Sequence, residues 1–235
     1  MSLLLLLKDE LRGFYRSKVM IFLWVGLPLM AVLFQFWSAS TQQVFSFTLL
    51  SAVLVSSIGG TLASVMLAVS IINEKNRHVY ELFLIRPEKR WNLIAAKFFA
   101  VYICIAVASF LAIAMGIGTD CLVRGGASGT VLKDALQSVS VSMSMMAVSS
   151  AAGVLIGVAS PSVLVGAILV IYGGNQISAI PMIPTILNIG NASLFTISSG
   201  ILISTVLLIL AALIFNKKQF WPWRKNMHVL IIETL

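Results

Sequence analysis

Two long stretches of this chain contain no Asp, Glu, Lys or Arg, and they constrain the fold more than any other feature of the sequence. They cover residues 19–73 and 135–216, and a shorter stretch covers residues 98–119. A helix of roughly 20 mostly apolar residues crosses the hydrocarbon core of a bilayer. By length, the three stretches hold two, three and one crossings. The sequence therefore predicts an all-α integral membrane protein with six transmembrane helices, in a single domain over residues 1–235.

The composition agrees with this fold class and excludes a soluble globular domain. Apolar residues make up 59% of the chain and charged residues only 10%, whereas soluble domains have about 25% charged residues. The six predicted spans cover residues 19–38, 44–73, 98–118, 135–160, 162–182 and 194–215.

Basic residues lie almost entirely on one side of these spans. Of the 16 Lys and Arg residues, 14 flank the spans on the side of the two termini, and only Arg124 and Lys133 fall on the other side. Cytoplasmic segments of membrane proteins carry such an excess. We therefore expect both termini in the cytoplasm and a multi-pass location in the cytoplasmic (inner) membrane. The net charge of +8 then suits anionic membrane lipid as a partner, and not nucleic acid.

The two terminal segments are both expected at the membrane surface. Residues 1–18 place apolar side chains at helical spacing opposite Lys8, Arg12 and Arg16, which predicts an amphipathic elbow helix that sets the angle of the first span. The alternative is an ordinary flank of that span. Residues 216–235 combine cations with interfacial aromatic residues, which is typical of a cytoplasmic tail that anchors at the surface.

The connector between the second and third spans, residues 74–90, is the most charged part of the chain. Val79, Leu82 and Phe83 form an apolar face on a short predicted helix, which Pro87 ends. A short amphipathic helix held between two spans can dock in the groove of a partner protein. The alternative is a helix that lies on lipid headgroups.

The residue order of this connector resembles the corresponding loop of type-2 permeases of ATP-binding-cassette (ABC) exporters. The family pattern is roughly Glu-Lys-x-Arg-Gly-Thr, then x-Glu-x-Leu-Leu, Pro, Arg and Gly-Lys. The chain matches it without a gap through Glu74-Lys75-Asn76-Arg77, Tyr80-Glu81-Leu82-Phe83-Leu84, Pro87, Arg90 and Lys97. It departs at His78-Val79, where the family has Gly-Thr, and at Ala96, where the family has Gly.

The resemblance implies that the connector is a coupling helix seated on a separate ATPase subunit. The residues that it assigns to this contact are Glu74, Arg77, Tyr80, Glu81, Leu84, Pro87 and Arg90. It also implies that a second permease chain, expected to form a homodimer, completes one pathway. ATP and Mg²⁺ are expected in the partner subunit and no cofactor in this chain, which lacks a G-x-x-x-x-G-K-[ST] loop.

The predicted span interiors contain no Asp, Glu or His. Proton- or ion-driven transporters usually carry such residues within the membrane, so energy supplied from outside the membrane is favoured. An uncharged interior suits an apolar or amphipathic cargo such as a peptide, lipid or drug. Three alternatives remain: a haem-export-type membrane subunit, a secondary transporter that holds sodium by carbonyls and hydroxyls, and a membrane scaffold without transport. We expect no catalytic or metal site, because none of the corresponding motifs is present.

Small and polar residues stand out in the fourth and fifth spans. Gly153 and Gly157 have the G-x-x-x-G spacing of close helix packing, and they are expected to pack within the chain, at a dimer contact or at a polar wall of the pathway. The fifth span ends in Tyr172-Gly173-Gly174-Asn175-Gln176, followed by two prolines. This pattern predicts a re-entrant hairpin between spans five and six, and the family resemblance implies that residues 183–193 form an external gate. Asn175 and Gln176 are expected either to contact cargo or to satisfy nearby backbone groups.

Overall fold

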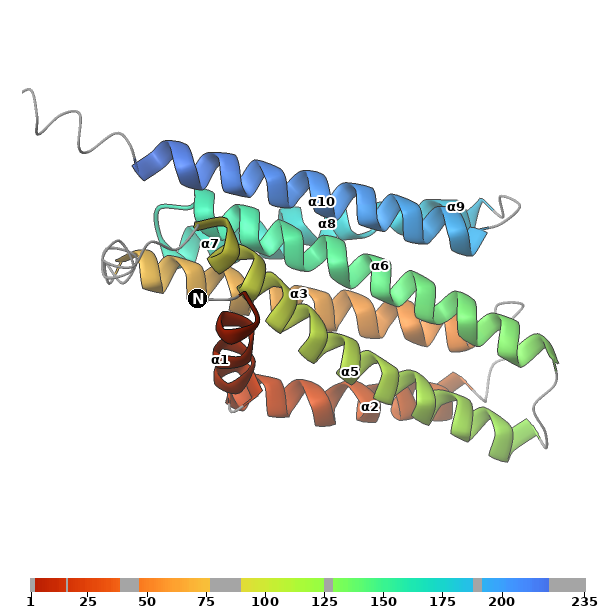
Figure 1. Ribbon diagram of the computed structural model, residues 1–235. Helices are drawn as coiled ribbons and strands as arrows, with labels where there is room; N and C mark the ends of the chain where they lie inside the picture. Colours follow the sequence, from red (N-terminus) through yellow and green to blue (C-terminus); the bar gives the residue numbers. More distant parts are fainter. Residues whose placement is uncertain are drawn as a thin grey trace, which may run out of the picture.

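A computed structural model gives the fold (Figure 1) and describes residues 3–15, 17–38, 47–76, 90–124, 129–187 and 192–219. The long helices are α1 (Leu3–Tyr15), α2 (Lys18–Ser38), α3 (Phe47–Asn76), α5 (Arg90–Arg124), α6 (Gly129–Ala159) and α10 (Ala192–Gln219). Between α6 and α10 the chain forms α7 (Val163–Leu169), the π-helix η2 (Val170–Gly174), α8 (Asn175–Ser178), the 3₁₀-helix η3 (Ile180–Met182) and α9 (Ile183–Ile186).

The prediction of an all-helical, multi-pass membrane protein is confirmed at a coarse level. Five helical stretches in the described ranges are long and apolar enough to cross a membrane. Helices α1 and α2 meet at a bend of 70°, and they provide a sixth crossing if the pair counts as one broken span. The side on which the termini lie and the position of α1 in the membrane surface stay predictions.

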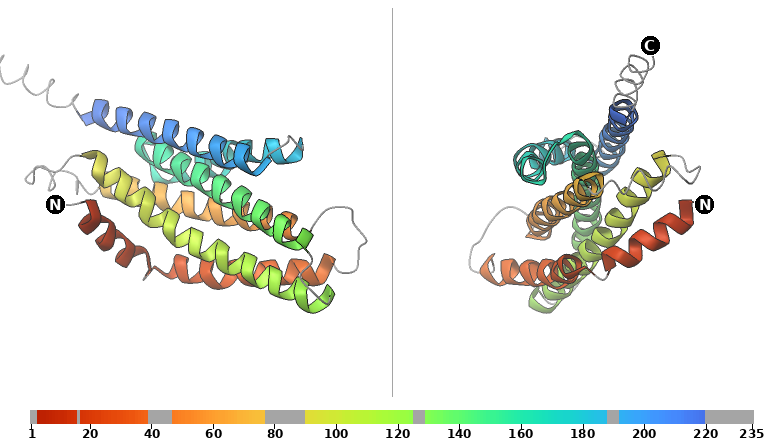
Figure 2. Two further views of the ribbon diagram at one scale, coloured as in Figure 1. Left: turned by 45° about the vertical axis from the view of Figure 1, so that its right-hand side comes forward. Right: turned by 90° about the vertical axis from the view of Figure 1, so that its left-hand side faces the viewer.

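Helix α6 lies at the centre of the bundle, between α3 and α10 (Figure 1). It packs most extensively against α3, next against α10, and also against α5. Helices α1 and α2 pack against α5 on the side away from α10 (Figure 2). In the most apolar stretch of α6, 78% of the residues are buried, against 17% in that of α10. The interior of the described bundle is therefore filled by its central helix.

Several helices extend beyond the spans expected from hydropathy. Helix α5 begins at Arg90, although the third span is expected from residue 98, and α6 begins at Gly129, although the fourth is expected from residue 135. Hydropathy marks only the part of a helix that lies in hydrocarbon. A helix can continue beyond that part through charged residues, as α5 does between Arg90 and Lys97.

The fifth span runs without a reversal from Val163 to Ile186. The Gly173-Gly174 pair lies in η2, where the helix widens to π geometry and then continues. Of the predicted re-entrant segment, Ile183–Ile186 forms α9, the last part of this same path. Residues 188–191 lie outside the described residues, so the hairpin itself stays a prediction.

Candidate functional site

The most unusual side chain in the described bundle is a buried lysine near the start of α5. Lys97 is only 2% exposed, and its Nζ lies 2.9 Å from Oε1 of Glu10 on α1. The same ammonium group forms an ion pair with Oε1 of Glu74 in the last turns of α3. We call this cluster of Glu10, Glu74 and Lys97 the Lys97 junction. One ammonium group therefore links three helices.

The Lys97 junction is stable because the buried charge is paired twice. An unpaired ammonium group in a low-dielectric interior is strongly unfavourable, whereas carboxylate partners compensate its lost hydration. Glu10 and Glu74 are 23% and 27% exposed, so both reach the surface. The hydroxyl of Ser70 also donates to Oε1 of Glu74, at 3.3 Å. The cluster therefore holds α1, α3 and α5 together, while its two carboxylates remain accessible from outside the bundle.

The residue after Glu74 links the same end of α3 to the central helix. Nζ of Lys75 donates to the carbonyl oxygen of Ser160, directly after α6, at 3.3 Å. A cation at this place complements the partial negative charge at the carboxyl end of a helix. The carboxyl ends of α3, α6 and α10 and the amino end of α5 lie together at one end of the bundle (Figure 1). Polar contacts thus tie that end of α3 to α1, α5 and α6.

The structure describes only part of the predicted coupling segment. Glu74 belongs to the Lys97 junction, and Arg90 is the first residue of α5. The remaining predicted coupling residues lie outside the described residues: Arg77, Tyr80, Glu81, Leu84 and Pro87. The two ends of the connector are therefore placed at the same end of the bundle, and docking on a partner stays a prediction.

Sequence reasoning missed Glu10 as a site residue, and it used Lys97 as a basic flank and as the last matched position of the family pattern. A signal was present, because the positions three and four residues from Lys97 are Leu93, Ile94, Ala100 and Val101, all apolar. No carboxylate on its own helix can reach a lysine in that setting. A buried lysine there requires a partner from another helix, but the sequence does not indicate which one.

A second polar region runs along the contact between α3 and α6, which we call the α3–α6 seam. A Cβ atom added at Gly153 would lie 2.7 Å from the carbonyl oxygen of Ser64, and one at Gly157 would lie 3.0 Å from Cα of Ala68. The Ser149 hydroxyl donates to that of Ser64 at 3.4 Å. The two glycines therefore lie against a helix of the same chain, and they let the two backbones approach closely.

Asn175 and Gln176 have different surroundings. Oδ1 of Asn175 accepts a hydrogen bond from the hydroxyl of Ser57 on α3, at 3.2 Å, while Gln176 is exposed. Asn175 thus binds a side chain on a neighbouring helix, and no described contact joins it to the nearby backbone groups that the sequence suggested. A role of either residue toward cargo stays a prediction.

Within the described ranges, no group of three or more His, Cys, Asp or Glu residues is arranged to hold a metal ion. No family model matches the chain, and no curated protein matches it.

Proposed function

We propose that this chain is the membrane-spanning permease subunit of an ABC transporter, most simply an exporter of an apolar or amphipathic peptide, lipid or drug. A separate ATPase subunit would bind and hydrolyse ATP. The observation that carries the proposal is the location of the Lys97 junction. Glu74 lies just before the connector and Lys97 shortly after it, and the same ion-pair cluster includes Glu10 of the N-terminal helix.

This arrangement suits the transfer of force from the connector to the spans. A displacement of the connector moves the end of α3, and the ion pairs of Lys97 carry that movement to α5 and α1. The contact of Lys75 with Ser160 extends it to the end of α6. Binding of ATP to a partner would then bias the bundle between two arrangements, as ligands do in other two-state proteins.

A second permease chain is part of the proposal because one bundle has little room for a path. The central helix α6 is packed on several sides by α3, α5 and α10, and most of its apolar stretch is buried. Cargo is therefore expected to pass at the surface of the bundle, between two copies of this chain. The exposed apolar stretches of α10 and of Val163–Ile186 offer surface for such an arrangement.

Purification of the tagged chain in mild detergent tests the proposal directly. We expect an ABC ATPase among the bound proteins, identified by mass spectrometry, and cargo-stimulated ATPase activity in the purified complex. Glu81→Arg should lower the recovery of the ATPase at least roughly tenfold, because charge reversal at a docked contact costs several kcal/mol.

The matched control is Asp134→Arg, the same charge change at the opposite predicted side of the membrane. It should leave the recovery of the ATPase unchanged. Equal recovery with Glu81→Arg and with the unmodified chain would contradict the role of the connector, and absence of any ATPase would contradict the assignment as a whole.

A further inference from the structure

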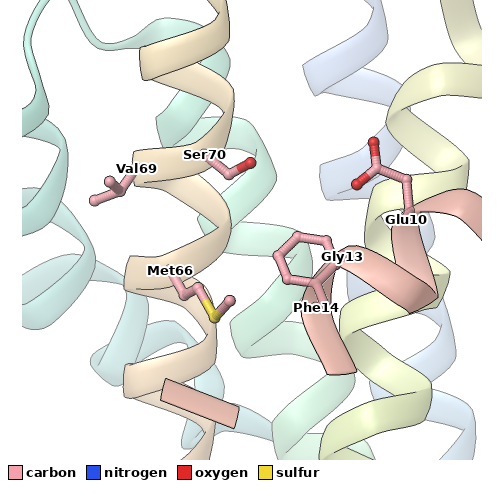
Figure 3. Close-up of a pocket in the computed structure, with 6 residues that line it drawn as sticks. All are labelled: Glu10, Gly13, Phe14, Met66, Val69 and Ser70. Atoms are coloured by element: carbon pink, nitrogen blue, oxygen red, sulfur yellow. The ribbon is translucent and has the colours of Figure 1, made fainter. Parts of the chain in front are cut away.

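A cavity of about 350 Å³ lies between α1 and α3, beside the Lys97 junction (Figure 3). Its lining residues are Glu10, Gly13, Phe14, Met66, Val69 and Ser70. Figure 3 shows the carboxylate of Glu10 and the hydroxyl of Ser70 toward one end of this space, with Phe14 and Met66 toward the other. The cavity therefore has a polar end and an apolar end.

The direction of this polarity matches that of a lipid in one leaflet. Ser70 is one turn from Glu74, near the end of α3, whereas Met66 is a further turn toward the middle of the span. The polar end thus lies nearer the end of the candidate span, and the apolar end lies nearer its middle. A phospholipid presents its headgroup and its acyl chains in the same order.

The charge of the cluster indicates which headgroup fits. The Lys97 junction has two carboxylates and one ammonium group, so its formal charge is −1. The described ion pairs use Oε1 of each glutamate, and a carboxylate can accept further hydrogen bonds at its second oxygen. A primary ammonium group donates three hydrogen bonds to such acceptors, while the trimethylammonium group of choline donates none.

We propose that this cavity binds phosphatidylethanolamine, a phospholipid with a primary-amine headgroup. Its ammonium group lies between Glu10 and Ser70, and an acyl chain follows Phe14, Met66 and Val69. The volume falls at the lower end of the roughly 300–1,000 Å³ of ligand pockets, which suits a headgroup and part of one chain. This inference uses α1, α3 and Lys97 of α5, and it holds whether or not the chain is a transporter subunit.

Native mass spectrometry of the full-length protein tests the inference. The purified protein is stripped of lipid in mild detergent and then exposed to equal amounts of dioleoyl phosphatidylethanolamine and dioleoyl phosphatidylcholine. We expect one bound phosphatidylethanolamine, preferred about tenfold over phosphatidylcholine, because only the primary ammonium group can donate hydrogen bonds to the carboxylate.

Gly13→Leu is the variant that fills the cavity. A Cβ atom added at Gly13 meets no other heavy atom within 4 Å, so a leucine can enter the cavity without a backbone collision. It should lose the bound phospholipid at least tenfold. The control is Gly118→Leu, since Gly118 also has open space but lies on α5 away from the cavity. Both variants should melt at the temperature of the unmodified protein.

Glu10→Gln tests the headgroup contact separately. It keeps the side-chain shape and leaves Glu74 paired with Lys97, so binding of phosphatidylethanolamine should fall to the level of phosphatidylcholine. Equal binding of the two lipids by the unmodified protein overturns the proposal. Retention of the lipid by Gly13→Leu overturns it as well.

Discussion

Helix α3 is held in the bundle by two contacts that work by opposite physical means. Along the α3–α6 seam, the backbone of α6 at Gly153 lies so close to Ser64 that a Cβ atom would not fit. At the Lys97 junction, three long charged side chains bridge α3 to α1 and α5. The seam is a steric contact without charge, whereas the junction is an ionic contact with little shape restriction.

The difference indicates where the bundle can change shape. Close backbone packing has one low-energy arrangement, because any shift either opens a void or causes a collision. Ion pairs between flexible side chains can lengthen or exchange partners while the helices move. We therefore expect α3 and α6 to move as one unit, and the ends of α1 and α5 to adjust relative to that unit.

Gly153→Leu should break the seam and produce the largest effect. Its Cβ would lie 2.7 Å from the carbonyl oxygen of Ser64 and 2.8 Å from Cα of the same residue. Neither backbone atom can turn aside, and overpacking of a filled core costs about 1–3 kcal/mol or more. We expect loss of monodisperse protein in fluorescence-detected size-exclusion chromatography. Gly118→Leu, at an open position of α5, should elute as the unmodified protein does.

The double variant Glu10→Gln with Glu74→Gln should break the junction and produce the next largest effect. It leaves the buried ammonium group of Lys97 without an opposite charge, which costs about 3–5 kcal/mol for a buried pair. Each single variant leaves one ion pair and should cost less than half of this amount. Melting temperatures in detergent provide the measurement. If the losses of stability in the two single variants add up to the loss in the double variant, the two carboxylates do not share Lys97.

Adding Lys97→Met to the double variant should recover most of the lost stability. Replacement of a whole buried ion-pair cluster by neutral residues of similar size is often neutral or stabilising, so we expect a gain of about 2–3 kcal/mol over the double variant. The seam offers no corresponding rescue experiment, since no second substitution would restore space for a side chain at Gly153. Failure of Lys97→Met to recover stability would mean that the junction is held by shape and not by charge.

The sequence predicted the helices well because long apolar runs in a membrane can satisfy their backbone only as helices. It predicted their ends poorly. Helix α5 starts at Arg90 and not at residue 98, because the charge-free apolar stretch marks only the part of the helix after Lys97. The Gly173-Gly174 pair lies within the fifth span, where one wider turn accommodates it in η2.

The candidate site was predictable only where its signal was local. The spacing of Gly153 and Gly157 indicates close helix packing, but it does not indicate which helix lies opposite. The partners of Lys97 lie on two other helices, at Glu10 and Glu74, and no periodicity in the sequence joins these positions. Long-range pairing of this kind depends on the packing of α1 against α5 and of α3 against α5.

The smallest predicted effect concerns a third kind of contact, neither steric nor ionic. The Ser57 hydroxyl donates to Oδ1 of Asn175 at 3.2 Å and joins α3 to the largely exposed fifth span. Hydrogen bonds between membrane helices contribute on average about 0.6 kcal/mol, so Ser57→Ala should lower the melting temperature only slightly. Thr205→Ala is the control, because Oγ1 of Thr205 donates to the Leu202 carbonyl of its own helix.

A double-mutant cycle over Ser57→Ala and Asn175→Ala isolates this bond from the other effects of each change. A coupling energy near 0.6 kcal/mol would identify a weak link between the seam and the fifth span. The fifth span could then move relative to α3 more easily than α6 can. A coupling above about 2 kcal/mol, beyond the largest values for such bonds, would mean that the fifth span is fixed to α3 and belongs to the same rigid unit.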